Sequence, residues 1–150
     1  ALLALNQTLL ASRDSREQRQ ESVQMGYSLR QLLAALPETA SQPLPAALQD
    51  GELAFLLAYG WAGCRLGLDE ATVVQAYLWG WLENQVMVLM KALPMGQTAG
   101  QQLMSALLPA LAAASEQALT LPDARLSAFA PMQSWMALRH ETQYSRLFRS

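Results

Sequence analysis

The chain is poor in the residues that build metal and redox sites. Its 150 residues include a single cysteine, Cys64, and a single histidine, His140. One cysteine excludes a disulfide within the chain, which fits a cytoplasmic location, and a structural zinc site needs about four cysteine or histidine ligands. We therefore predict no metal site, no cofactor and no catalytic residue. We expect Cys64 to be a small, buried hydrophobic residue.

Charged residues are also scarce, at 15% of the chain, whereas an average soluble domain has about 25%. Ten basic and twelve acidic residues give a net charge of −2. Proteins that bind nucleic acid or anionic lipid usually carry a basic patch, so we expect neither nucleic acid nor a membrane as partner. Because 52% of the residues are hydrophobic, the low charge indicates surfaces that a protein partner buries.

The motifs of common enzyme sites are missing. Gly96 and Gly100 have the spacing of a glycine-rich loop, but no Gly-Lys-Ser/Thr follows them and no strand precedes them, so they do not form a phosphate-binding loop. Paired carboxylates and a nucleophile with a nearby base are not found either. We predict that the protein is not an enzyme, and that Gly96 to Gly100 begin a helix where a neighbouring helix or a partner lies close.

Helical patterns run through the whole chain, and no segment has the alternation of a half-buried strand. Ser15 and Gln18 fit a capping box. The mixed-sign run 13–21 is interpreted as a solvated helix face, and 37–51 as a loop. We predict an all-α fold with residues 1–150 as a single domain and helices near 15–36, 52–65, 69–93, 101–119 and 131–141. The first of these carries an apolar stripe of Met25, Leu29, Leu32, Leu33 and Leu36.

The segment from Asp69 to Leu93 is apolar around its whole circumference, which is typical of a helix at the centre of a bundle. Polar residues at 83–85 and Lys91 interrupt it before the ~20 residues that a membrane span requires. We expect its tryptophans to pack in the core, and Trp81→Ala to cost about 3 to 5 kcal/mol. The uncharged stretch between Lys91 and Glu116 is predicted to be core or a partner-facing surface.

The C-terminal segment is unusual, because chain ends are normally polar and frayed. It carries Tyr144, Leu147 and Phe148 together with Arg146 and Arg149. Tyrosine, phenylalanine and arginine are enriched at protein interfaces, so residues 143–150 are a candidate docking tail. The alternative is a last helical turn that packs its leucine and phenylalanine on the chain's own core.

Four motifs, in the same order along the chain, together resemble the urease accessory protein F family, UreF. The last is the most distinctive. They are Gln24-Met25-Gly26-Tyr27-Ser28-Leu29, Tyr77-Leu78-Trp79-Gly80-Trp81-Leu82-Glu83-Asn84-Gln85, Pro94-Met95-Gly96-Gln97 with Gly100-Gln101, and His140-Glu141 with Tyr144-Ser145-Arg146-Leu147-Phe148-Arg149-Ser150.

The resemblance implies an all-helical, non-enzymatic protein that dimerises and helps install nickel in urease. It implies a bridge between the accessory protein UreD, also called UreH, and the GTPase UreG on apo-urease, acting as a gate on GTP hydrolysis, a nickel path, or both. It also implies two groups of partner-binding residues. The docking element contains His140, Glu141, Tyr144, Arg146 as its anchor, Leu147, Phe148 and Arg149, and the second group contains Lys91, Gly96, Gln97, Gly100 and Gln101.

The chain departs from the family pattern in two ways. Pro-Met-Gly-Gln stands where the family usually has Pro-Leu-Gly-Gln, a nearly volume-conserving change. The family usually has a further N-terminal portion, so the chain is expected to be a C-terminal fragment. An alternative function is a helical small-molecule-binding or regulatory domain that uses its tryptophan- and methionine-rich core as a pocket.

Overall fold

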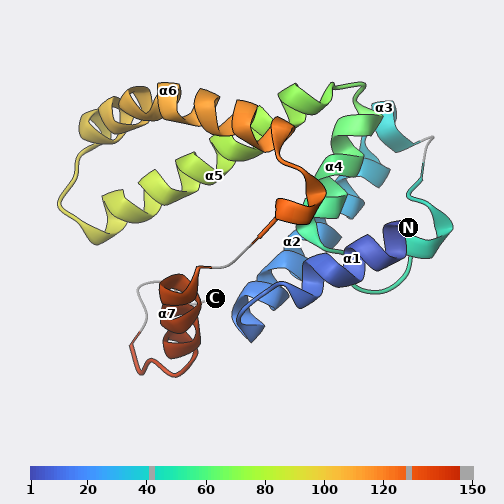
Figure 1. Cartoon of the computed structure of the whole chain (residues 1–150), viewed down its shortest axis with the longest axis horizontal. Helices are drawn as coiled ribbons and strands as arrows, with labels where there is room; N and C mark the ends of the chain where they lie inside the picture. The colour runs from blue at the N-terminus through green and yellow to red at the C-terminus, as the bar shows by residue number, and fades with distance from the viewer. Residues whose placement is uncertain (41–42, 128–129, 146–150) are drawn as a thin grey trace. The chain divides into compact units, whose positions relative to one another are not determined.

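A computed structural model of the chain describes residues 1–40, 43–127 and 130–145 (Figure 1). The described residues form helices and no strand, which confirms the predicted all-α class. The elements are α1 (Leu2–Ala11), α2 (Arg16–Ala35), α3 (Pro37–Ala40), η1 (Ala46–Leu48), α4 (Phe55–Arg65), α5 (Glu70–Ala92), α6 (Gln97–Thr120), η2 (Asp123–Arg125) and α7 (Pro131–Glu141).

The backbone divides into two compact units. The first contains residues 1–68 and the described residues from Ser127 onward, and the second contains Asp69–Leu126. The organisation of 1–150 as one domain, with 143–150 as a tail, stays a prediction.

In the first unit, α2 packs against α4 and the segment before it. Gly26 is buried, and a Cβ atom added there would lie 2.1 Å from the carbonyl oxygen of Leu53, so only glycine allows this approach. Asn6 of α1 holds the same segment, donating to the Glu52 carbonyl at 2.9 Å and accepting from the Ala54 N–H at 2.8 Å. The core around these contacts consists of Leu44, Leu48, Leu53 and Ala58.

The buried face of α2 differs from the predicted stripe. Leu33 is buried and Leu29 packs against the core, but Met25 and Leu32 are exposed, Leu32 by 52%. The line of closest approach runs through Ser22, whose hydroxyl accepts from the Phe55 N–H at 3.2 Å, and through Gly26. A small polar residue and a glycine define this face because they let the backbones come close, and a count of apolar residues misses them.

The ends of α2 follow the sequence signals closely. Ser15 is the N-cap, and its hydroxyl accepts from the Gln18 N–H at 3.2 Å. The side-chain oxygen of Gln18 accepts from the Asp14 N–H at 3.1 Å. A capping box predicts this hydrogen bond at the N–H of the N-cap itself, Ser15. The helix ends before Pro37, as predicted. The segment 37–51, predicted as a loop, contains α3 and η1.

The second unit is a hairpin of α5 and α6. Asp69 caps α5, accepting from the Thr72 N–H at 2.7 Å, and this hydrogen bond lowers the pKa of its carboxyl group. Gly100 is buried where a Cβ would lie 2.5 Å from the sulfur of Met90, so the predicted close neighbour of this helix start is α5 itself. Leu82, Val86 and Met104 form the buried core of the hairpin.

Within its own unit, α5 is not surrounded by other helices, which differs from the prediction of a central helix. Its main packing partner is α6, so one stripe is covered, with Leu82 and Val86 buried. Trp81 is 54% exposed, and Trp79 is also exposed. An apolar circumference shows that a helix has surface to bury, but not that its own unit buries it. The large cost expected for Trp81→Ala is therefore not supported by its burial.

Two smaller expectations also fail. Cys64 is exposed rather than buried, because α4 turns its opposite side toward α2, with Ala58 and Gly63 covered. Glycines inside the helix predicted at 52–65 indicate the close approach of another helix, but a Cβ atom added at Gly60 would meet no atom within 4 Å. Glycine is common just after the end of a helix, and Gly67 follows α4 in this way, with φ +67° and the Leu68 N–H donating to the Gly63 carbonyl at 3.0 Å.

Candidate partner-binding site

The helix that leads into the predicted docking tail is α7, and its bounds are those expected from the sequence. Pro131 occupies the first turn, where its missing N–H costs nothing. Arg139 lies in the last turn, where the helix dipole favours its positive charge. Four large apolar side chains of α7 are exposed: Met132, Trp135, Met136 and Leu138.

The other side of α7 contacts the start of α2 through polar groups. The Ser134 hydroxyl donates to Asp14 Oδ2 at 2.7 Å. Nδ1 of His140 lies 2.7 Å from Glu17 Oε2, and a carboxylate oxygen at this distance requires Nδ1 to carry the proton. Glu141 Oε1 accepts from the Glu17 backbone N–H at 3.2 Å. His140 and Glu141, both predicted to bind a partner, therefore contact α2 in the chain itself.

The tail residues divide between the described and undescribed parts of the chain. Tyr144 is fully exposed. Arg146, Leu147, Phe148 and Arg149 lie outside the described residues. Their role as a docking element, and the alternative of a core-packed last turn, both stay predictions.

The second predicted group surrounds the turn between α5 and α6, in the other unit. Lys91, Gly96, Gln97 and Gln101 are exposed, and Gly96 is the N-cap of α6. Gly100 is buried against the flexible side chain of Met90, so the hairpin itself accounts for its burial. Partner binding by this group stays a prediction.

Sequence reasoning misses Asp14, Glu17 and Ser134. The run 13–21 is interpreted from its sequence as a solvated face, yet Arg19 also pairs with Glu52 at 2.6 Å. The hydrogen bond from Arg19 lowers the pKa of the Glu52 carboxyl group and raises that of the guanidinium. The mixture of charges indicates that side chains of this run form ion pairs or hydrogen bonds. Their partners cannot be identified from the sequence because they lie 33 to 124 residues away.

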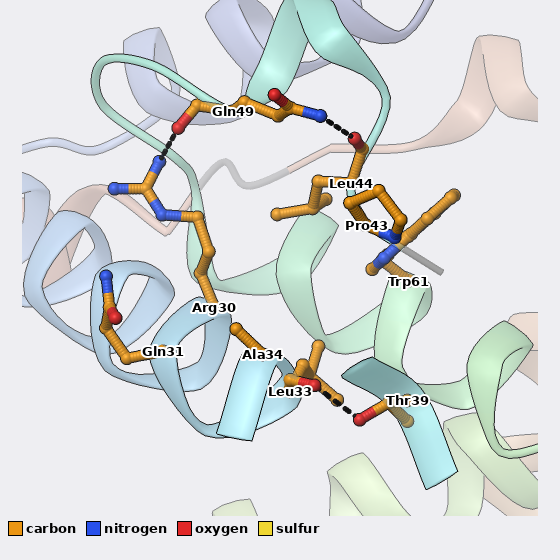
Figure 2. A pocket seen from close by; sticks show the side chains of 9 residues that line it. All are labelled: Arg30, Gln31, Leu33, Ala34, Thr39, Pro43, Leu44, Gln49 and Trp61. Atoms are coloured by element: carbon orange, nitrogen blue, oxygen red, sulfur yellow. Dashed lines mark hydrogen bonds between the residues drawn. The ribbon is translucent and has the colours of Figure 1, made fainter. Parts of the chain in front are cut away.

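A pocket of about 280 Å³ lies in the first unit (Figure 2). Arg30 donates to the Gln49 carbonyl at 2.7 Å across its edge, and Trp61 closes another side. Gln31, Ala34 and Pro43 in its wall are exposed, so the hollow is open. Its lining contains one tryptophan and no methionine, unlike the tryptophan- and methionine-rich pocket of the alternative function.

In the part of the chain that the structure describes, no group of three or more histidine, cysteine, aspartate or glutamate side chains is arranged to hold a metal ion. None of the described helices combines the length and the apolar character needed to cross a membrane.

Comparison with known proteins gives consistent matches. The family model described as UreF matches residues 1–108. The urease accessory protein UreF of Dechloromonas aromatica (strain RCB) is 43% identical over 147 residues, which cover 97% of this chain and 64% of the relative. Proteins of the same name from Azoarcus sp. (strain BH72) and Ectopseudomonas mendocina (strain ymp) are 47% and 49% identical, covering 97% and 93% of this chain.

The chain spans slightly less than two thirds of the length of these curated relatives, 62 to 64% for the three. The family model nevertheless covers well over half of the chain, and the identity is high over nearly all of it. The chain belongs to the UreF family.

Proposed function

We propose that the protein is a urease accessory protein, an assembly factor that acts by binding other proteins during nickel insertion into apo-urease. The observation that carries the proposal is the extended match to relatives named urease accessory protein UreF. The composition supports a binding role, because the chain is rich in hydrophobic residues and poor in charge. In this proposal nickel is cargo, and the protein itself catalyses no reaction.

We further propose that UreD, also called UreH, binds the C-terminal element. The exposed apolar side chains of α7 support a partner there, since Met132, Trp135 and Met136 form a patch that water contacts in the isolated chain. Tryptophan and methionine are enriched at interfaces. Arg146 in the tail is the proposed anchor, because a guanidinium makes several directional hydrogen bonds at once.

UreG and a second copy of the protein are the other proposed partners. The hairpin of α5 and α6 supports such additional contacts, because Trp79, Trp81, Met87 and Val88 are exposed on α5. Lys91 at the end of α5 and Gly96 and Gln97 at the start of α6 belong to the same unit. In this role the protein bridges UreD and UreG and modulates GTP hydrolysis by UreG.

One co-purification experiment tests the proposal. The natural protein is produced with an affinity tag and is mixed in turn with UreD, UreG and apo-urease. We expect direct capture of UreD, and capture of UreG and apo-urease once UreD is present. Failure to retain UreD under conditions where the protein is folded would contradict the proposed function.

A further inference from the structure

The polarity of α7 is reversed relative to an ordinary surface helix. A surface helix normally turns its apolar stripe to the core and its polar side to water. In α7 the side toward α2 carries Ser134, His140 and Glu141, whereas Met132 and Trp135 are 68% and 57% exposed. No residue of α7 is buried. Packing of an apolar face therefore cannot be what holds this helix in place.

Polar contacts with the start of α2 hold α7 in place instead. The first N–H groups of a helix have no partner within the helix. Ser15 satisfies one of them, at Gln18, and Glu141 of α7 satisfies another, at Glu17. The carboxylate of Glu141 thus lies at the positive end of the α2 dipole, where a negative charge is favoured.

The side chain of Glu17 completes a reciprocal arrangement. Its carboxylate accepts from His140, the residue next to Glu141, so one residue of α2 binds two neighbours on α7 through its backbone and its side chain. Asp14 and Ser134 add a third contact about two helical turns away along α7. Two points of attachment fix both the position of a helix and its rotation about its own axis.

An 11-residue helix such as α7 is marginal in water without tertiary contacts. We propose that Asp14 and Glu17 form a latch that keeps α7 helical and seated on α2, with its apolar side facing outward. The latch presents the apolar patch formed by Met132, Trp135 and Met136 in one orientation. Its consequence for partner binding rests on the proposed function, but its effect on α7 does not.

Hydrogen–deuterium exchange on the whole protein tests the latch without any partner. The variant combines Asp14→Ala with Glu17→Ala, and Glu21→Ala, at an acidic residue further along α2, is the matched control. We expect the amides of α7 to exchange about tenfold faster or more in the latch variant, as expected for a segment whose opening becomes easier. Amides in the α2 interior and in α4 should keep their rates, and Glu21→Ala should match the parent.

His140→Ala supplies the same test from the α7 side. If His140 and Glu17 act through each other, adding Glu17→Ala to His140→Ala should produce less than the sum of the two single effects. Unchanged α7 exchange in the latch variant would overturn the proposal. Equal acceleration along α2 and α7 would also overturn it, because the contacts would then stabilise α2 rather than hold α7.

Capture of UreD supplies the second measurement. If release leaves about a tenth of the molecules with α7 in place, the apparent Kd for UreD should rise about tenfold, while deletion of 144–150 should abolish capture. Latch variants that bind UreD as tightly as the parent would overturn the positioning role. Failure of the parent protein to bind UreD would contradict the proposed function. The hydrogen–deuterium exchange result would still show whether the latch exists.

Discussion

At the scale of single residues, two helical glycines differ in the space available for a side chain. A methyl group at Gly26 would meet the backbone of Leu53, which cannot move without displacing the start of α4. Gly60 has open space around the corresponding position. The same substitution therefore separates a glycine required by packing from one that packing does not require.

We expect Gly26→Ala to lower the free energy of unfolding by about 1 to 3 kcal/mol or more, through overpacking against backbone. Gly60→Ala should be neutral or raise it by up to about 1 kcal/mol, because alanine favours the helix. Urea denaturation of both variants checks this pair. Equal destabilisation by the two substitutions would contradict the described contact between α2 and α4.

Adjacent residues of α5 allow a second matched comparison. Leu82 is buried in the hairpin at 8% exposure, whereas Trp81 is mostly exposed. Leu82→Ala should cost about 2 to 5 kcal/mol, as for a large core truncation. Trp81→Ala should cost clearly less despite removing a larger side chain. Chemical denaturation measures the free energy of unfolding of both variants. A larger loss for Trp81→Ala than for Leu82→Ala would support α5 as a fully buried central helix.

At the scale of elements, the N-cap of α5 gives the stability of the chain a defined pH dependence. Hydrogen bonds from Thr72 lower the pKa of Asp69 below its usual value of 3.8. A lowered pKa means that the folded state binds this proton less readily than the unfolded state. The stabilisation is therefore fully present above about pH 4 and is lost as the pH falls through the lowered pKa.

Asp69→Asn keeps a good capping side chain but removes the charge. We expect this variant to lose part of the acid dependence of unfolding below about pH 4, and Asp123→Asn, in the same unit, to retain it. Thermal melts between neutral pH and strong acid provide the measurement. If the two variants follow the same pH profile as the parent, the cap at Asp69 does not contribute.

Helix existence and helix ends are largely predictable from local chemistry. Ser15 and Asp69 indicate two starts through capping side chains, and Pro131 begins α7 where expected. The buried faces are less predictable. Leu32 is exposed and Gly26 buried, because the face that packs is chosen by the neighbouring element, which local periodicity does not contain.

At the scale of the whole molecule, the family is predictable because four motifs keep their order along the chain. The latch between α2 and α7 is not, since Glu17 and His140 are separated by 123 residues. Each of these residues has an ordinary local interpretation, as a solvated helix residue or as part of a tail. Only the fold brings them together.

The proposed function also predicts what the isolated chain should fail to do. With one histidine and one cysteine, and without a phosphate-binding loop, it should neither bind nickel tightly nor hydrolyse GTP. Calorimetry with Ni²⁺ and a phosphate-release assay check both points. Micromolar or tighter nickel binding that disappears in His140→Ala would contradict the prediction and assign His140 to the metal.

The central claim is that the C-terminal element docks UreD, with Arg146 as anchor. The most direct measurement is the affinity of the protein for UreD in the parent, in Arg146→Ala, and in Arg125→Ala, an arginine of η2 outside the tail. We expect Arg146→Ala to weaken binding by about 2 kcal/mol or more, as for a buried arginine hot spot, without changing the melting temperature. Arg125→Ala should bind like the parent. Parental affinity in Arg146→Ala, or an equal loss in both variants, would contradict the account.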